Sequence, residues 1–343
     1  MQARAVREVG WGIVGLGGIA ERVARAIGAA EGATLAAVCS RTAERAETFA
    51  REFGAARSYS DYSAFLSDEA VSLVYIATPN ALHAHQTIEA LGAGKHVLVE
   101  KPMALTVEDA ERMVETARSR GLRLGVGFHL RHHPVHLAAR DLLAGGELGN
   151  VVFAEAIWGS YSSDVRLDNW KFDPELAGAG SLAGLGVHLI DLLRWLSGQE
   201  VIEVAAFADG PSERYPVEFL LTALLHFDGG AYAQLTSSRR LRNADNTVTL
   251  YCDGGRLRGQ SALSMDPAGE LQVIRGEEEV VNAFPARDLY ELEVESCSAA
   301  VGGGGDFAAS GIDGLRSVEV TAALLESARS GRAVTVSERP SRL

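Results

Sequence analysis

Apolar positions in the first third of the chain fall into short runs separated by longer amphipathic stretches. The runs predict strands at 11–14, 34–38, 71–77, 96–99 and 122–127. In the stretches between them apolar residues recur every three or four positions, which predicts helices at 18–29, 43–53, 81–91 and 107–120. Strands that alternate with helices in this way indicate a parallel sheet with crossover helices.

The pattern changes after about residue 130, where longer apolar runs follow one another with fewer helices between them. We expect strands at 151–161, 201–208, 219–227, 231–237, 247–252 and 271–274, and helices at 134–144, 187–196 and 311–330. Asp228-Gly229-Gly230 and Asp253-Gly254-Gly255 supply the residue types that tight turns between antiparallel strands require. The second part of the chain therefore predicts an antiparallel sheet.

The chain has 343 residues, more than one hydrophobic core usually serves, so we expect two domains. The fold class is α/β. Residues 1–128 are predicted to form a Rossmann domain with a doubly wound parallel sheet, and residues 129–343 an α+β domain with a large, mainly antiparallel sheet. The second domain is expected to bind substrate and to oligomerise, with its C-terminal helix packing back on the first domain.

Charge and cysteine content narrow the choice of partners. A formal net charge of −13 opposes binding to nucleic acid or to an anionic membrane, because both require clustered Lys and Arg. Cys39, Cys252 and Cys297 are far apart and lack metal-ligand spacing, which favours a reducing cytoplasm and no metal site. No signal peptide is recognisable, and no uninterrupted apolar run approaches the ~20 residues that cross a bilayer, so we expect a soluble cytoplasmic protein.

A glycine-rich segment directly follows the first predicted strand and opens the first helix. Its sequence, Gly15-Leu16-Gly17-Gly18-Ile19-Ala20, has the spacing of a dinucleotide-binding turn. Gly15 permits the tight turn, Gly17 lets a pyrophosphate approach the backbone, and the small Ala20 permits close packing of helix and sheet. We therefore expect Gly15, Gly17, Gly18, Ile19 and Ala20 to bind a nicotinamide cofactor at a helix N-terminus.

The end of the second predicted strand bears on the choice between NAD and NADP. Here the chain reads Cys39-Ser40-Arg41-Thr42, without the carboxylate that usually binds the adenosine ribose in NAD-selective sites. Ser40 and Thr42 offer hydrogen bonds to a 2′-phosphate, and Arg41 offers its charge or a stacking surface for adenine. NADP is therefore preferred over NAD, unless Arg41 is only a solvated residue at the start of a helix.

Three further motifs carry a resemblance to a known family. They are Ala77-Thr78-Pro79-Asn80 with His83, Glu100-Lys101-Pro102, and Gly186-Val187-His188 with Asp191. With them the chain resembles the glucose-fructose oxidoreductase and inositol dehydrogenase (Gfo/Idh/MocA) family along almost its whole length. The resemblance implies an NAD(P)-dependent oxidoreductase that transfers a hydride to or from a secondary alcohol or ketone of a sugar, polyol or related compound.

The resemblance also implies roles for the motif residues. Lys101 would lie beside the nicotinamide and the substrate hydroxyl, and Glu100 would support the turn. The cofactor would be lined by Thr78, Pro79, Asn80 and His83. Independently of the family, a lysine at the carboxyl end of a parallel strand lies in the crevice where ligands bind, and a pKa lowered there suits proton transfer.

His188 is the second catalytic candidate, since the family places its counterpart against the substrate hydroxyl or carbonyl. Asp191 is three positions further along the same predicted helix, where it either orients His188 or caps and solvates nearby groups. The histidines at 129, 132, 133 and 136 lack a clean metal-ligand arrangement, so structural or substrate contacts are expected. Candidate substrate residues are Tyr161, Arg166, Trp170, Lys171 and Asp191.

Gly184 departs from the family pattern, which has an aspartate four residues before the histidine. We expect the missing carboxylate to leave His188 less well oriented and to disfavour alcohol oxidation. Two alternatives to net hydride transfer stay open: redox-assisted glycoside elimination or hydrolysis with tightly bound NAD, and a non-catalytic NADP-binding sensor. The open face of a large sheet would expose apolar surface, which predicts a homo-dimer or homo-tetramer.

Overall fold

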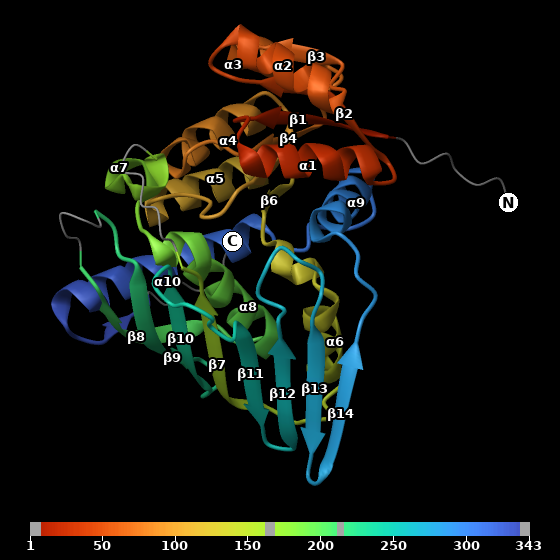
Figure 1. The fold of residues 1–343 in the computed structure, drawn as a ribbon. Helices are drawn as coiled ribbons and strands as arrows, with labels where there is room; N and C mark the ends of the chain where they lie inside the picture. Colours follow the sequence, from red (N-terminus) through yellow and green to blue (C-terminus); the bar gives the residue numbers. More distant parts are fainter. Residues whose placement is uncertain (1–7, 162–168, 211–215, 337–343) are drawn as a thin grey trace, which may run out of the picture. The chain divides into compact units, whose positions relative to one another are not determined.

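The computed structural model describes residues 8–161, 169–210 and 216–336. The chain divides into two compact units, each built from two separate stretches (Figure 1). Unit 1 comprises Met1–Gly127 and Arg287–Leu315, and unit 2 comprises Phe128–Ala286 and Arg316–Leu343. The sequence alone places a single boundary after residue 128, whereas unit 1 also takes in a later stretch.

Unit 1 contains a parallel six-stranded sheet in the order β3-β2-β1-β4-β5-β6. The strands are β1 (Val9–Val14), β2 (Ala33–Cys39), β3 (Arg57–Tyr59), β4 (Leu73–Ile76), β5 (His96–Val99) and β6 (Leu124–Val126). All neighbouring pairs run parallel, and this order is that of a doubly wound dinucleotide-binding sheet. The predicted Rossmann fold is confirmed, with β3 as an additional short edge strand.

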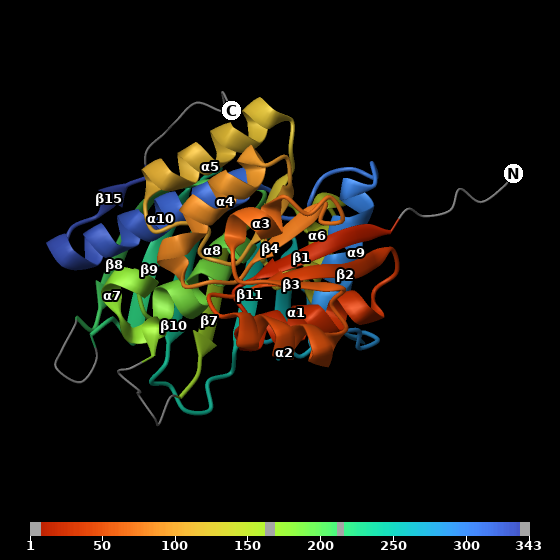
Figure 2. The same cartoon turned by 90° about the horizontal axis from the view of Figure 1, so that it is seen from above.

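Helices cover both faces of this sheet (Figure 2). One face packs against α1 (Gly18–Ala29), α2 (Ala43–Phe53) and α9 (Leu289–Val301), and the other against α3 (Tyr62–Leu66), α4 (His83–Gly92) and α5 (Val107–Arg120). Adjacent residues of β1 show the two sides: the Trp11 indole donates to Ser298 Oγ of α9 at 3.0 Å, whereas Gly12 lies against Phe65 of α3. Burial on both faces explains why these strands are continuous apolar runs.

Unit 2 contains a nine-stranded sheet in the order β14-β13-β12-β11-β7-β10-β9-β8-β15. The strands are β7 (Val151–Gly159), β8 (Val201–Ala208), β9 (Leu220–Phe227), β10 (Tyr232–Ser238), β11 (Thr247–Cys252), β12 (Gly255–Gln260), β13 (Glu270–Arg275), β14 (Glu278–Ala283) and β15 (Val334–Thr335). Every neighbouring pair is antiparallel except β7 and β10, which run parallel. The predicted, mainly antiparallel sheet is confirmed.

One face of the unit 2 sheet is covered by α6 (Pro134–Ala144), α8 (Val187–Ser197) and the unit 2 part of α10 (Gly311–Ser330), which form one apolar core with it. The run Pro174–Ser197 is long and apolar enough to cross a membrane, contrary to the expectation that no such run exists. However, 78% of its most apolar window is buried within the protein, as in the core helix of a globular domain. This run leads through α7 (Pro174–Ala177) and the π-helix η4 (Leu182–Gly186) into α8.

The opposite face of the unit 2 sheet carries exposed apolar side chains. Phe207 on β8 is 77% exposed, and Leu224, Tyr232, Tyr251 and Val281 on other strands are also exposed. Residues that alternate with them, such as Ala206 and Leu225, are buried under the helices. Within the described residues this face therefore presents apolar surface to its surroundings.

Candidate functional site

The glycine turn after β1 has the space that a pyrophosphate needs. Gly15 has φ of +86°, and a Cβ there would stand 2.6 Å from the Thr78 backbone nitrogen, so only glycine fits. At Gly17 and Gly18, by contrast, no atom lies within 4 Å of the place that a Cβ would take. Ala20, in the first turn of α1, is fully buried in the core. The turn thus leaves open space in front of the first amides of α1, which suits an anionic group.

The segment after β2 offers polar groups without a carboxylate. Ser40 is half-buried, and Arg41 and Thr42 are exposed. Among the described residues, no hydrogen bond or ion pair holds the Arg41 side chain, and the Thr42 hydroxyl does not cap α2. These side chains are therefore available to a phosphate, as the sequence predicts for an NADP site.

His83 connects the loops that follow β4 and β5. Its ring is completely buried, with Nδ1 2.8 Å from the Pro102 carbonyl oxygen and Nε2 2.9 Å from the Thr78 carbonyl oxygen. Burial lowers the pKa of His83, and the neighbouring Lys101 charge acts in the same direction. Both ring nitrogens face these carbonyls, so His83 ties the two loops together and does not face outward.

Glu100 holds the backbone that carries Lys101. Its carboxylate accepts hydrogen bonds from the Tyr75 hydroxyl and, at 3.2 Å, from the Lys101 backbone amide. Glu100 and Tyr75 are buried, and Lys101 is half-buried at the carboxyl edge of the sheet, directly after β5. In the loop after β4, Thr78 and Pro79 are half-buried and Asn80 is buried. Unit 1 therefore brings the predicted cofactor residues and Lys101 to one sheet edge.

His188 occupies an aromatic corner of unit 2 at the start of α8. It is 3% exposed, and its ring centroid lies 5.8 Å from Phe128, 4.8 Å from His129 and 5.4 Å from Trp158. The contact with His129 gives that residue a place in the candidate site, although its sequence position alone does not separate it from the other histidines. Sequence reasoning misses Trp158, because nothing in the sequence indicates that β7 ends beside α8.

Asp191 is paired with a residue that the sequence does not suggest. Arg131 Nε donates to its Oδ2 at 2.9 Å and Arg131 Nη2 donates to its Oδ1 at 2.6 Å, and both side chains are at least 96% buried. This two-point ion pair lies in the interior of unit 2, where the carboxylate is enclosed. Both oxygens of Asp191 therefore accept hydrogen bonds from Arg131. Neither role expected from the sequence, orienting His188 or capping nearby groups, includes this ion pair.

The other predicted substrate residues flank a stretch outside the described residues, which includes Arg166. Tyr161 is 45% exposed, and the Arg242 guanidinium lies 3.4 Å over its ring. Trp170 and Lys171 belong to a short 3₁₀ helix, η3 (Trp170–Phe172), with the Lys171 ammonium 6.0 Å from the Trp170 ring centre. Within the described ranges no ring contact joins Tyr161 to Trp170, so the structure does not gather these candidates into one cluster.

Gly184 lies in η4, and a side chain from the far end of β10 fills the space beside it. A Cβ at Gly184 would overlap Nη2 of Arg239 and would stand 3.2 Å from its Cζ and 3.5 Å from its Nε. Arg239 directly follows β10 and is 55 residues away in sequence. Sequence reasoning misses this residue as well, because its position depends on the packing of η4 against the end of β10.

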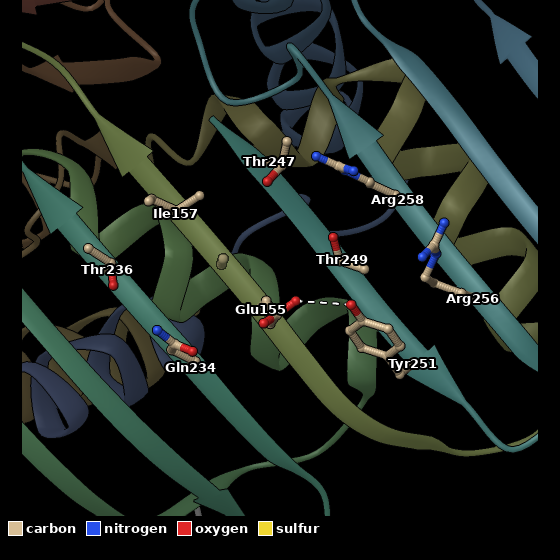
Figure 3. A pocket seen from close by; sticks show the side chains of 10 residues that line it. Glu155, Ile157, Gln234, Thr236, Thr247, Thr249, Tyr251, Arg256 and Arg258 are labelled. Atoms are coloured by element: carbon tan, nitrogen blue, oxygen red, sulfur yellow. Dashed lines mark hydrogen bonds between the residues drawn. The ribbon is translucent and has the colours of Figure 1, made fainter. Parts of the chain in front are cut away.

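A separate hollow of about 290 Å³ lies on the sheet face of unit 2 that the helices leave open (Figure 3). Arg256 and Arg258 of β12 line it opposite Glu155 of β7, whose Oε2 accepts a hydrogen bond from the Tyr251 hydroxyl at 3.1 Å. None of the predicted site residues that the structure describes lines this hollow. It is therefore distinct from the residues predicted to do chemistry.

Comparison with known proteins covers both units. Residues 9–128 match a family model described as an oxidoreductase family with an NAD-binding Rossmann fold, and residues 136–258 match the GFO/IDH/MocA C-terminal domain. The 1,5-anhydro-D-fructose reductase of Ensifer adhaerens is 31% identical, over 95% of this chain and 98% of the relative. The D-xylose 1-dehydrogenase (NADP(+)) 2 of Haloferax volcanii is also 31% identical, over 94% of this chain and 98% of the relative.

Among solved structures, aldose-aldose oxidoreductase from Caulobacter crescentus, complexed with glycerol, is similar throughout. It has a TM-score of 0.88 and 29% sequence identity, and the match covers 96% of this chain and 100% of that one. The similarity thus extends over the full length of these proteins and includes both kinds of sheet.

Proposed function

The chain belongs to the Gfo/Idh/MocA oxidoreductase family, and from this premise we propose that it transfers a hydride between NAD(P) and a secondary alcohol or ketone of a sugar, polyol or related compound. The observation that carries the proposal is the open glycine turn at one parallel sheet edge that also holds Lys101. Ligands of doubly wound sheets bind at the carboxyl edge of the strands.

The cofactor is proposed to lie along that edge of unit 1. The backbone at Gly15, Gly17, Gly18, Ile19 and Ala20 would hold the pyrophosphate, because the space at Gly17 and Gly18 is open. Residues of the next two loops, Thr78, Pro79, Asn80 and Glu100, would line the nicotinamide half. When bound, the cofactor supplies or accepts the hydride at nicotinamide C4.

Lys101 is proposed to give or take the proton at the reacting substrate oxygen, and His188 to assist there as a second acid-base group. Glu100 and His83 act as positioning residues, since one fixes the Lys101 amide and the other fixes the loop carbonyls around it. His83 therefore supports the cofactor loops through their backbone, in place of the direct cofactor contact that the family resemblance suggests.

Tyr161, Trp170 and Lys171 remain proposed substrate contacts, since their side chains are wholly or partly accessible. Asp191 is better explained as the partner of Arg131, because both of its oxygens accept from that guanidinium. The relatives named above are reductases and dehydrogenases, which favours net hydride transfer over elimination and over a non-catalytic sensor.

NADP is proposed as the preferred cofactor, on the strength of Ser40, Arg41 and Thr42 and the absence of a carboxylate among them. A cytoplasmic location is proposed from the three cysteines, which are all free and of which Cys39 and Cys297 are buried.

A homo-dimer or homo-tetramer is proposed to form through the open sheet face of unit 2. Phe207 and Leu224 would be covered by a second copy, and the hollow places Glu155 opposite Arg258, so two copies related by a two-fold axis present complementary charges. Light scattering after size-exclusion chromatography tests this assembly: Leu224→Asp should yield monomers, and a monomeric wild-type protein would contradict it.

The reaction is tested by following nicotinamide absorbance in both directions with NADP and NAD. The panel should include aldoses, ketoses, polyols and anhydro sugars, and isothermal titration should first show that the cofactor binds. Turnover of a secondary alcohol or its ketone supports the proposal. Tight cofactor binding without turnover of any member of the panel would contradict it and favour a sensor.

A further inference from the structure

Two guanidinium groups of unit 2, those of Arg131 and Arg239, differ in their partners. Arg131 is paired at two points with Asp191. Arg239 is half-buried beside Gly184, yet among the described residues its side chain forms no hydrogen bond and no ion pair. A charge that is partly removed from water and has no partner is unfavourable, so its position requires an explanation.

The nearest carboxylate does not satisfy Arg239. Glu218 acts on it only through space, and no ion pair within 4 Å joins them. The Glu218 oxygens are instead taken up by backbone amides, accepting from Gly180 at 2.8 and 2.9 Å and from Leu182 at 2.8 Å. Glu218 therefore anchors the start of η4 and leaves the guanidinium donors of Arg239 unused.

Arg239 lies in the same corner of unit 2 as His188. β7 and β10 run parallel, so they end at one edge, with Trp158 in register with Ser237. Trp158 contacts the ring of His188, and a Cβ at Gly186 would stand 3.0 Å from Ser237 Oγ, which places η4 directly against the end of β10. The guanidinium meets η4 at Gly184, about one helical turn before His188.

Gly184 is what makes room for this arrangement. Any side chain there would overlap the guanidinium, and an aspartate, as in the family pattern, would also neutralise it. The corner consequently gains a positive group where its relatives are expected to carry a negative one. A planar guanidinium with five donors matches a carboxylate or a phosphate, which accept two parallel hydrogen bonds.

We propose that Arg239 binds an oxyanion group of the substrate, so that this enzyme acts on an acidic sugar derivative, either a sugar carboxylate or a sugar phosphate. The inference rests on the proposed function, since it assigns the substrate class to the same site. Arg239 selects the substrate by charge, while Lys101 and His188 keep their acid-base roles.

The kinetic test compares matched sugars that share one ring and differ in the group at C6, such as glucose, glucuronate and glucose 6-phosphate, together with the corresponding galactose series. The quantity measured is kcat/KM for each acid divided by kcat/KM for its neutral parent. Wild-type protein should favour one acidic series, and the series that it favours distinguishes carboxylate from phosphate. Arg239→Met should lower that ratio about 30-fold or more. The ratio for Arg239→Lys should lie between those of the wild type and Arg239→Met.

Arg240→Met is the matched control, because it removes the same charge from the next residue. Arg240 is half exposed and already paired with Asp209 at 2.7 Å, so its loss should leave the ratio unchanged. A second readout excludes a merely structural role: Arg239→Met should raise the melting temperature, since it removes a half-buried charge without breaking a pair. A lower melting temperature together with an unchanged ratio would overturn the inference.

Binding is measured separately from turnover, with glucuronate and glucose 6-phosphate added to the cofactor-loaded protein in titration calorimetry. Tighter binding of an acid than of glucose, lost in Arg239→Met, supports the inference even if no reaction follows. Turnover of neutral sugars with no preference for either acid refutes the role of Arg239 and leaves the proposed function intact. Preferential binding of an acid without turnover of any sugar refutes the proposed function alone.

Discussion

The sheet edge of unit 1 and the η4 corner of unit 2 treat their buried polar groups in opposite ways. In unit 1, His83 faces two carbonyls, Tyr75 donates to Glu100, and Glu100 accepts from the Lys101 amide. In unit 2, a glycine stands at the family's carboxylate position, and Arg239 beside it has no side-chain partner among the described residues.

This difference separates two tasks. Internal hydrogen bonds fix the loops around Lys101 whatever the substrate, which suits chemistry shared across a family. A charged group that lacks an internal partner, such as Arg239, is stabilised when a complementary ligand arrives, which suits selectivity. Unit 1 is thus organised for a common reaction and the η4 corner for a particular substrate.

The largest expected effect tests the unit 1 side of the comparison. Lys101→Ala should lower kcat by ~10²- to 10⁴-fold, because proton transfer at the substrate oxygen is lost. Cofactor affinity, measured by fluorescence titration, should stay close to that of the wild type, since Glu100 holds the backbone amide of this position. Near-wild-type rates on a true substrate would remove Lys101 from the mechanism.

The second prediction concerns the pH dependence of stability that a buried histidine of unit 2 causes. His136 in unit 2 is fully buried, its Nδ1 is 3.0 Å from the Leu130 carbonyl oxygen, and its Nε2 has no hydrogen-bond partner in the described part of the chain. Burial, with the neighbouring His133, lowers the pKa of His136 to about 3. The unfolded state therefore takes up a proton below pH 6.5 before the folded state does, and stability falls as the pH drops towards 3.

The loss attributable to His136 should reach roughly 3 kcal/mol at pH 4. Urea unfolding at pH 7, 5 and 4 measures it, and His136→Asn should flatten the pH dependence, while its amide nitrogen at the position of Nδ1 retains a donor for the Leu130 carbonyl. An equally steep decline in the variant would assign the acid sensitivity to other groups.

A third substitution would give the η4 corner an internal polar contact of the kind that unit 1 already has. Gly184→Asp gives Arg239 an internal partner, so the preference for acidic over neutral sugars should fall about 10-fold. From the sequence alone, the same substitution is expected to orient His188 and raise alcohol oxidation. Because the guanidinium already occupies the space at Gly184, the new carboxylate should pair with Arg239 first.

Gly184→Asp in an Arg239→Met background separates these two effects. If oxidation rises only in the double variant, the carboxylate reaches His188 once the guanidinium is gone. Thermal melting of both proteins provides the check on folding. An unchanged acid preference in the single variant would show that Arg239 does not set it.

The smallest expected effect tests the preference of unit 1 for NADP. Arg41→Ala should weaken NADP binding several-fold, by about 1 kcal/mol, because Arg41 is exposed and its contact with a 2′-phosphate is screened by solvent. NAD affinity should change less. Equal losses for both cofactors in parallel titrations would leave Arg41 as a solvated residue at the start of α2.

Most of the fold follows from local patterns. α1, α2, α5 and α6 have the predicted bounds, because regular apolar spacing and end signals agree there. For α5, Thr106 accepts from the Asp109 amide at 3.1 Å and Gly121 ends the helix with φ of +61°. Such signals need only neighbouring residues, so a sequence suffices to locate them.

The elements that the sequence does not predict lack these local signals. β3 has only three residues, and β14 at the sheet edge is exposed throughout, so neither shows a buried apolar run. α9 carries Glu293 on a buried surface, where burial and nearby Glu100 raise the pKa of its carboxyl group. A charged residue type at a buried position obscures the apolar spacing on which a helix prediction depends.

The residues of the candidate site also fall into those that the sequence predicts and those that it does not. The glycine turn and the Lys101 loop are contiguous in sequence, so motif spacing is sufficient to name them. Arg239, Trp158 and the partner of Asp191 come together through strand order and through the π-helical turn η4, which alters the usual four-residue spacing. Only a three-dimensional arrangement brings these residues to Gly184 and His188.

The late return of α9 to unit 1 has a consequence for biosynthesis. Its residues Tyr290, Val294 and Cys297 belong to the apolar core around Trp11, but the ribosome adds them long after β6. At about 5–20 residues per second, the nascent sheet waits roughly 10–35 s with that surface uncovered. Until α9 has been synthesised, the nascent chain exposes this apolar surface. Newly made copies should therefore depend on chaperones until translation passes residue 301.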